Sequence, residues 1–581
     1  MTQLMTRRPL LLLCTALLAT TSFAQARTAR HHAPVLAPPT LFAKGVVSAA
    51  DPRAAEAGAE MLRAGGSATD AAIATMLALT VVEPQSSGIG GGGFYLASDA
   101  KGKVETIDGR ETAPKAAHGQ WFWKDGAPMG FRDAVPGGTS VGVPGNMALA
   151  AKAHARHGKL AWRRLFAPAI RLAGEGWTVS PRFHEFLEFA RGSAAFVPDG
   201  AGLFYDADGR SLVAGTQVKN PALAKTLTAL SLRGPRGFYT SPNAAAIVKR
   251  VTTAPRNPEP MTLADVASYR AKDRAPLCGT YRGYRICGMG PPSSGETTVF
   301  AVLKQLERFD LTALGPDSPV AWHLIAESER LAYADRARYL GDPDFNAVPA
   351  AGLIDAGYLA QRSELIDPGK TIANAEAGTP PGARNLVRAN LTPGPEHGTS
   401  HFAVVDRWGS AVSYTSTVES AFGSGLVVGG YYLNNELTDF DFQPEQAGRP
   451  AANRVEGGKR PRSSMAPTLV YAPDGKLRLV IGAAGGVTIP AQVAKAVIGV
   501  IDWKLSAEEA IALPTIFAPD GPSVFVEKGT SMEAMIPALV ALGHADVRPR
   551  AASFKGNAVE VVDGKLIGAP DRRSEGRAVS E

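Results

Sequence analysis

The sequence predicts an α+β fold in which sheets are sandwiched between helices. Three observations predict it. Helical patterns dominate the part before residue 345, strand patterns follow one another over 401–484, and a helical pattern returns at 491–503. Elements in this order bury their apolar faces when helices pack against the faces of sheets.

Composition places the chain among ordinary globular proteins. Its 581 residues are 45% hydrophobic and 20% charged, with a net charge of +7. The basic residues are scattered and form no run, so nucleic-acid binding has no support. No stretch after residue 30 has the ~18 apolar residues of a membrane span. No sequence motif predicts a metal site or a cofactor.

Residues 1–26 have the layout of a secretory signal peptide. Arg7 and Arg8 precede an apolar run, and Ala24–Ala26 has the small residues of a cleavage site. The apolar run is too short for a retained membrane anchor. We therefore expect a periplasmic or secreted protein whose mature chain begins at residue 27.

Two cysteines remain in that mature chain, Cys278 and Cys287. If Arg282 and Gly283 form a two-residue hairpin turn, counting outward places the cysteines opposite each other at a non-hydrogen-bonded pair. A disulfide there suits an oxidising compartment, and two reduced structural cysteines are the alternative.

The first elements of the mature chain are two helices and a strand. Asp51 has the character of an N-cap, and the proline after it opens a helix that extends to about residue 66. A second helical pattern covers 67–83, and glycines then lead into a strand that ends near residue 98. A longer helical pattern follows at 321–340.

Two glycine motifs in this half resemble catalytic signatures but lack their context. The glycines within 88–93 match a dinucleotide fingerprint, yet a helix precedes them and a strand follows, the reverse of what phosphate binding needs. We expect a tight packing turn there. Residues 138–142 match the GxSxG elbow of serine hydrolases, but Pro144 interrupts the helix that must start after Ser140.

A linker separates the two halves of the sequence. Residues 376–398 are polar, rich in proline and glycine and without periodicity, which is typical of an exposed linker. The strand patterns 401–406 and 411–419 follow and predict a hairpin, because Gly409 ends the loop where positive φ is needed. The register of that hairpin places Thr399 opposite Thr417.

Thr399 has the chemistry of an N-terminal nucleophile. Its hydroxyl can attack the carbonyl of Gly398 in an N-to-O acyl shift, and hydrolysis of the ester frees a new N-terminus. An α-amine has a pKa of about 7.7 to 8.0, so near neutral pH it can accept the hydroxyl proton. Thr417 can hold the hydroxyl by a hydrogen bond. Threonine is also common at strand starts, so this interpretation depends on the neighbouring residues.

Three other segments suit an acyl-transfer site. Gly485 and Gly486 follow a strand and can point two backbone N–H groups at an oxyanion. Ser463 and Ser464 are small donors suited to a carboxylate, and Arg110 suits a bidentate carboxylate contact. Each segment alone is equally typical of an ordinary turn, loop or surface residue.

Together these segments resemble the gamma-glutamyltransferase (glutathione hydrolase) family. GTSHFAVVD, STVESAFGSG, LNNELTDFDF, GKRPRSSMAPT and AAGGV occur in the family's order, and EPQSSGIGGGGF, DGRETAP and LAYADRARYLGDPDF extend the resemblance to nearly all of the mature chain. The resemblance implies a four-layer αββα N-terminal nucleophile hydrolase. It also implies a precursor that cuts itself into a large chain, 27–398, and a small chain, 399–581, which remain associated as a heterodimer.

The resemblance implies a role for each site residue, and no cofactor or metal. Thr399 is the nucleophile of self-cleavage and catalysis, Thr417 is its hydrogen-bonding partner, and Gly485 with Gly486 forms the oxyanion hole. Two sets bind the head of a γ-glutamyl substrate such as glutathione: Arg110, Ser463 and Ser464 its α-carboxylate, and Glu436 and Asp439 its α-ammonium. Water or an amino-acid or peptide amine is the acceptor. The resemblance makes 138–142 a surface strand.

Two departures from the family pattern leave alternatives open. Glu419 stands where well-studied members have Asn near the α-amino group, which suits either a tighter ammonium site or a different acyl group. The stretch 439–463 is shorter than in members with a lid and lacks the lid's tyrosine, which favours hydrolysis over transfer. A lidless branch that hydrolyses glutaryl-type cephalosporin side chains is the alternative activity. A secreted solute-binding protein without turnover is the alternative of another class.

Overall fold

The structure is a computed structural model that describes residues 41–581, except 241, 385, 387–397, 447 and 553–554. The predicted signal peptide and most of the predicted linker lie outside the described residues. In the described part, no helix has both the length and the apolar character that crossing a membrane requires.

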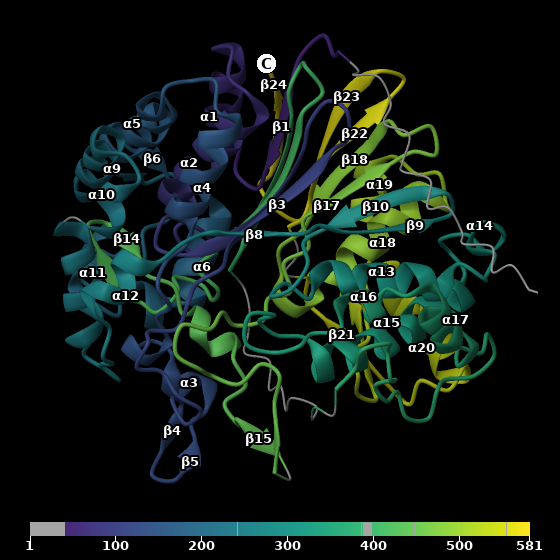
Figure 1. Cartoon of the computed structure of the whole chain (residues 1–581). Coiled ribbons are helices and arrows are strands. Elements are labelled where there is room, and N and C mark those ends of the chain that lie inside the picture. The colour runs from purple at the N-terminus through teal and green to yellow at the C-terminus, as the bar shows by residue number, and fades with distance from the viewer. Residues whose placement is uncertain (1–40, 241, 385, 387–397, 447, 553–554) are drawn as a thin grey trace, which may run out of the picture. The chain divides into compact units, whose positions relative to one another are not determined.

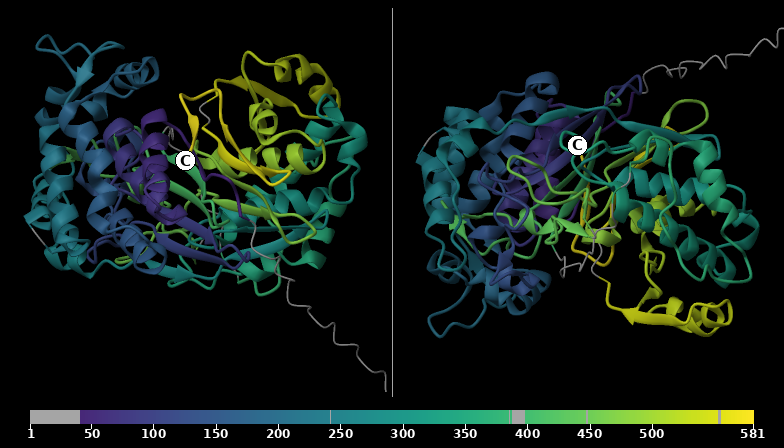
Figure 2. Two further views of the ribbon diagram at one scale, coloured as in Figure 1. Left: turned by 90° about the horizontal axis from the view of Figure 1, so that it is seen from above. Right: turned by 60° about the horizontal axis from the view of Figure 1, so that its bottom comes forward.

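The first sheet has seven antiparallel strands, with the predicted hairpin at its centre (Figure 1). The strand order is β24 (Arg577–Ser580), β1 (Val46–Ala49), β11 (Ser400–Val405), β12 (Ala411–Thr417), β2 (Gly92–Ser98), β3 (Val104–Gly109) and β8 (Lys272–Arg274). On one side of the hairpin, β1 pairs with β11, and β24 from the other end of the described chain pairs with β1. Figure 2 shows the C-terminal end beside the purple N-terminal segment.

The register of the hairpin β11–β12 is the predicted one. The Asp406 N–H donates to the Ser410 carbonyl over 2.9 Å, and Gly409 has a φ of +86°. Ser400 pairs with Ser416 at the far end. Because the register is fixed along the whole hairpin, Thr399 and Thr417 lie beside each other where the strands end.

The second sheet has six antiparallel strands. Their order is β23 (Lys565–Pro570), β22 (Asn557–Val562), β18 (Leu477–Gly482), β17 (Thr468–Tyr471), β10 (Tyr284–Gly288) and β9 (Leu277–Tyr281). In the β9–β10 hairpin Cys278 pairs with Cys287, as the register count predicted, and a disulfide joins them.

The two sheets pack against each other. Leu96 and Ala403 of the first sheet share a buried apolar cluster with Leu469, Val480 and Val559 of the second. Ser413, whose side chain lies between the sheets, donates to the carbonyl of Ile481 over 2.9 Å and accepts from the N–H of Thr468 over 3.1 Å. This polar side chain is therefore satisfied across the interface between the sheets.

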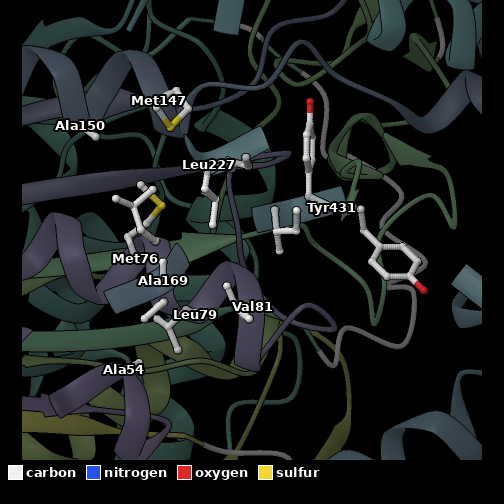
Figure 3. Packing of buried hydrophobic residues seen from close by; sticks show 14 of the residues in the cluster. Ala54, Met76, Leu79, Val81, Met147, Ala150, Ala169, Leu227 and Tyr431 are labelled. Atoms are coloured by element: carbon white, nitrogen blue, oxygen red, sulfur yellow. The ribbon is translucent and has the colours of Figure 1, made fainter. Parts of the chain in front are cut away.

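Helices form a large apolar core with each sheet. α1 (Pro52–Arg63), α2 (Ala68–Val82) and α4 (Asn146–His157) pack with the first sheet, and Figure 3 shows Met76 and Leu79 of α2 near Met147 and Ala150 of α4. α13 (Gly295–Leu306), α15 (Pro319–Tyr339) and α18 (Ile489–Ile501) pack with the second sheet. The fold is thus a mixed one of helices and antiparallel sheets, as predicted.

The predicted start of α1 and the predicted packing turn are confirmed. Asp51 is the N-cap of α1 and its carboxylate accepts from the N–H of Arg53 over 2.8 Å. In the turn between α2 and β2, a Cβ on Gly90 would lie 2.0 Å from the carbonyl oxygen of Tyr432, and one on Gly91 would lie 1.9 Å from that of Thr417. Glycine is needed there because other backbone segments approach so closely.

The expectation of a surface strand at 138–142 is wrong. Residues Gly138–Ser140 form a buried 3₁₀ turn whose Gly138 and Thr139 N–H groups donate to the carbonyls of Arg256 and Asn257. The Ser140 hydroxyl donates to the carbonyl of Gly137 over 2.8 Å. The hydrogen bonds of this segment therefore stabilise a buried turn, and the segment does not pair with a strand as the expectation required.

Candidate active site

Thr399 and Thr417 form a hydroxyl pair at the open end of the central hairpin. Their Oγ1 atoms are 2.9 Å apart, and both residues are buried. The Thr417 hydroxyl also accepts from the N–H of Glu419 over 2.8 Å. The hydroxyl of Thr399 is therefore held by a partner that is itself fixed by the backbone.

The backbone at Thr399 is strained. Its φ is +74°, a left-handed conformation that a β-branched residue rarely adopts and that costs about 1–3 kcal/mol. The Thr399 N–H donates to the carbonyl of Ser86 over 2.8 Å. A Cβ on Gly398 would lie 1.8 Å from the carbonyl oxygen of Glu419, so only glycine fits before Thr399. The peptide bond between Gly398 and Thr399 is therefore buried, and contacts with Ser86 and Glu419 fix its position.

Arg110 lies at the centre of a buried ion cluster. It follows β3, and its guanidinium pairs with Glu436 and Asp439, which bound the 3₁₀ turn Glu436–Asp439. It also donates to the carbonyls of Pro461 and Arg462 over 3.1 and 3.0 Å. The family resemblance implies that Arg110 and the two acids bind opposite ends of a ligand. Here they pair directly, since buried charges need partners.

Burial raises the pKa of two carboxyl groups beside Arg110, those of Glu436 and Glu111. Burial raises the pKa of Glu436 to about 7, against the opposing effect of Arg110. Burial and then the Glu436 carboxylate raise the pKa of Glu111 well above its usual value. Although burial alone would lower it, these acids raise the pKa of Arg110, so the guanidinium stays charged.

Glu419 reaches the site from the turn after β12. Its carboxylate accepts from the side chains of Ser420 and Asn435. Asn435, which the sequence analysis did not identify, also fixes this turn because its Oδ1 accepts from the N–H of Ser420 over 2.9 Å. The doubled asparagine directly before Glu436 was the signal that could have found it.

Ser463 and Ser464 are positioned by segments that precede and follow α13. The N–H of Ser463 donates to the carbonyl of Pro292 over 3.0 Å. The hydroxyl of Ser464 accepts from Arg336 of α15 over 2.6 Å, and Arg336 also donates to Ser294 over 2.8 Å. Arg336 lies in the predicted helix 321–340, but nothing in its local pattern indicated a role beside the site.

Gly485 and Gly486 form the turn between β18 and α18. Their φ values are +129° and +59°, which side chains other than glycine rarely allow. The Thr488 hydroxyl donates to the carbonyl of Gly485 over 2.8 Å, and the Gln492 side chain donates to that of Ala484 over 3.0 Å. These two hydrogen bonds hold carbonyl groups at the turn and thereby fix its conformation.

One small cavity brings nearly all the predicted site residues together. Its lining is Arg110, Thr399, Thr417, Glu419, Glu436, Asp439, Ser463, Ser464, Met465, Gly486 and Ile489. Gly485 is not in the lining, and Met465 and Ile489 were not predicted. A hydroxyl, a guanidinium and three carboxyl groups around one cavity suit acyl chemistry on a substrate with a zwitterionic head. Within the described ranges, no group of three or more His, Cys, Asp or Glu side chains can hold a metal ion.

Comparisons with known proteins agree on one family. The family described as Gamma-glutamyltranspeptidase matches residues 54–580. The chain is 36% identical over 516 residues to a Glutathione hydrolase proenzyme of Bacillus subtilis (strain 168), covering 86% of this chain and 85% of the relative. It is 34% identical over 551 residues to an Acylase ACY 1 proenzyme of Pseudomonas sp. (strain SE83), covering 93% and 94%.

Among solved structures, a cephalosporin acylase from Bacillus halodurans is similar over most of both chains. Its TM-score is 0.81 at 26% sequence identity, with 94% of this chain and 98% of that chain covered. Glutathione hydrolase and acylase, the activities named among these relatives, correspond to the activity predicted from the sequence and to its alternative.

Proposed function

The chain belongs to the gamma-glutamyltranspeptidase family, and on that premise we propose that it is a self-processing γ-glutamyl hydrolase and acyltransferase with Thr399 as its nucleophile. The observation that carries the proposal is the hydroxyl pair of Thr399 and Thr417 on the wall of a cavity that also presents Arg110 and three acids. Glutathione or another γ-glutamyl compound is the substrate that suits these groups.

The proposed fold is the four-layer αββα sandwich of N-terminal nucleophile hydrolases. Two features support it: the sheets share an apolar cluster, and each sheet has its own helical core. In this arrangement the hairpin β11–β12 is an inner element, which keeps bulk water from the peptide bond before Thr399.

Self-processing would occur at the bond between Gly398 and Thr399. The Thr399 hydroxyl attacks the carbonyl carbon of Gly398, and the C–N bond breaks as the Thr399 nitrogen takes up a proton and becomes a free amine. Water then hydrolyses the resulting ester, which frees the Gly398 carboxylate and restores the Thr399 hydroxyl. The positive φ at Thr399 supports this step, because cleavage would release its backbone strain. The large chain, 27–398, and the small chain, 399–581, would stay together as a heterodimer because β1 and β2 flank β11 and β12.

Turnover would use the same hydroxyl with the new amine as base. The amine accepts the Thr399 proton as Oγ1 attacks the γ-amide carbonyl, and the N–H groups of Gly485 and Gly486 stabilise the oxyanion. The amine leaving group departs with a proton and leaves a γ-glutamyl ester on Thr399. Water resolves this ester in hydrolysis, and an amino-acid or peptide amine resolves it in transfer.

Recognition of the γ-glutamyl head would require an exchange of partners in the ion cluster. The α-carboxylate binds Arg110 with Ser463 and Ser464, and the α-ammonium binds the acids that Arg110 releases, Glu436 and Asp439, together with Glu419. The direct pairing of Arg110 with these acids supports this exchange. The cation and the acids lie side by side on the cavity wall, where each could instead bind the opposite charge of a substrate.

An N-terminal signal peptide, 1–26, and a periplasmic or secreted location complete the proposal. The disulfide between Cys278 and Cys287 supports this location, because disulfides persist in oxidising compartments.

A glutaryl-type cephalosporin acylase is the second candidate function. The similarity to the Pseudomonas acylase proenzyme and to the solved cephalosporin acylase favours it, as does Glu419 in place of Asn. Comparing cleavage of γ-glutamyl and glutaryl anilides by one preparation separates the two activities. A ratio in favour of the glutaryl anilide would replace the proposed substrate with the alternative one.

A denaturing gel and the Thr399→Ala variant test the proposal. The wild-type protein should give two fragments that meet at Gly398–Thr399 and should release amine from a γ-glutamyl anilide in a burst. Thr399→Ala should remain one chain and show no turnover, whereas Ser140→Ala should be cut and active. An uncut wild-type chain would instead support a solute-binding protein, and lost activity in Ser140→Ala alone would move the nucleophile to that serine.

A further inference from the structure

A buried ion pair, Lys555 with Glu83, lies near the candidate nucleophile and outside the cavity lining. Lys555 precedes β22, and Glu83 ends α2; the Lys555 Nζ is 3.2 and 3.4 Å from the two carboxylate oxygens of Glu83. Their side chains are 1% and 5% exposed. Burying two charges is costly, and the sequence analysis gave neither residue a role.

The pair is connected to Thr399 through two serines. The Lys555 Nζ donates to the Ser86 hydroxyl over 2.9 Å, and the carbonyl of Ser86 accepts the Thr399 N–H over 2.8 Å. The hydroxyl of Ser400, the residue after Thr399, donates to Glu83. The Thr399 nitrogen, which would become the α-amine, is therefore linked to Lys555 through Ser86 and to Glu83 through Ser400.

The charge of this pair affects the protonation of a nearby amine. A carboxylate beside an amine favours the ammonium form, and a cation beside it favours the neutral base. A neutral amine is needed to accept the Thr399 hydroxyl proton. Burial lowers the pKa of Lys555 to about 8, which still leaves the ammonium group charged at neutral pH to offset Glu83.

Other charged groups face this region from several elements. Asp51, paired with Arg53 on α1, and Arg182 on α6 (Pro181–Phe189) act on Lys555 or Glu83 from outside. On the cavity side the charged groups are Arg110, Glu419, Glu436 and Asp439. All of these remain unchanged when Glu83 or Lys555 is replaced, so they contribute equally to every variant below.

We propose that Glu83 and Lys555 are positioning residues whose opposed charges offset each other, so that part of the Thr399 amine remains a neutral base near neutral pH. The inference rests on the proposed function, because the amine exists only after the chain is cut before Thr399. The backbone carbonyl of Lys555 also accepts from the N–H of Ala484 over 3.2 Å, so the same residue connects to the segment that leads into the Gly485–Gly486 turn.

The test is the acid limb of the pH profile of kcat/KM for a γ-glutamyl anilide, measured on fully cut protein. Lys555→Met leaves the Glu83 carboxylate alone and should move the limb up by about one pH unit, a roughly tenfold loss at low pH. Glu83→Gln leaves the ammonium group alone and should move the limb down by about the same amount. The double variant should return to within about 0.3 units of wild type.

Opposite shifts that cancel in the double variant separate this role from a purely structural one. Lys495→Met is the matched control, since Lys495 is also a buried lysine but donates to the carbonyls of Ile511 and Leu513 and to the hydroxyl of Thr515. It should leave the limb at the wild-type pH even if it lowers the melting temperature.

Failure of the inference is distinguishable from failure of the proposed function. Wild-type protein that is uncut or inactive contradicts the function itself. If wild type is cut and active, superimposable acid limbs in the two single variants overturn the role of the pair. Should Lys555→Met remain uncut, Glu83→Gln alone decides, and a limb at the wild-type pH or above it overturns the proposal.

Discussion

The hydroxyl pair and the ion cluster occupy one cavity but are built in different ways. Thr399 and Thr417 belong to one hairpin, and a hydrogen-bonded ladder fixes their approach. Arg110 and Glu436 are 326 positions apart in sequence and meet only because two distant turns converge. The first region, proposed for the chemistry, is therefore specified by a single motif, and the second, proposed for recognition, is assembled by the tertiary structure.

If the two regions are separable, Arg110→Met should abolish recognition and leave processing intact. The substitution leaves the substrate carboxylate without its cation, and truncating one partner of a buried charge pair costs about 2–5 kcal/mol of binding, so kcat/KM should fall at least about thirtyfold. A denaturing gel should still show two fragments. An uncut Arg110→Met chain of normal melting temperature would show that the cluster also serves the cleavage step.

Thr417→Val tests the opposite side of the comparison. It removes the hydroxyl that contacts Thr399 Oγ1 while retaining the side-chain shape, so both the cleavage rate and kcat should fall about tenfold. KM should stay near its wild-type value, because the ion cluster is untouched. Thr417→Ser should restore both rates, and a rise in KM alone would contradict the separation of the two regions.

Glu419→Gln sharpens the question of what the cluster recognises. If Glu419 binds an ammonium group, the variant should lose about tenfold in kcat/KM for a γ-glutamyl anilide and much less for a glutaryl anilide, which has no such group. Steady-state kinetics with both substrates measure the difference. Equal losses would refute a contact between Glu419 and the α-ammonium.

The smallest expected effect is a pH dependence of KM. Burial raises the pKa of Glu436 to about 7, so this carboxyl gains its proton as the pH falls below 7 and can no longer attract an ammonium group. KM for the γ-glutamyl anilide should rise about threefold between pH 7.5 and 6. Glu436→Gln should bind more weakly at every pH and lose this dependence; an unchanged slope would assign it to another group.

Several elements outside the site also show which structural features can be predicted from sequence patterns alone. The N-cap of α1, the glycine turn before β2 and the pairing of Cys278 with Cys287 depend on local geometry, and each was predicted correctly. The segment 138–142 was not, because its hydrogen bonds go to residues 256 and 257, more than a hundred positions away. The strands β22, β23 and β24, which complete the two sheets, also had not been identified.

By itself the sequence determined the candidate residues for the chemistry and their local register: the threonine after a linker, its partner across the hairpin and the paired glycines after a strand. Such features depend on spacings of a few residues, which backbone geometry converts directly into distances. Only the tertiary structure decided that Arg110 pairs with Glu436 and Asp439, that Asn435 holds Glu419, and that Lys555 pairs with Glu83. Charged groups far apart in sequence form an ion pair where burial leaves them no other partner, and no local sequence pattern predicts such a pair.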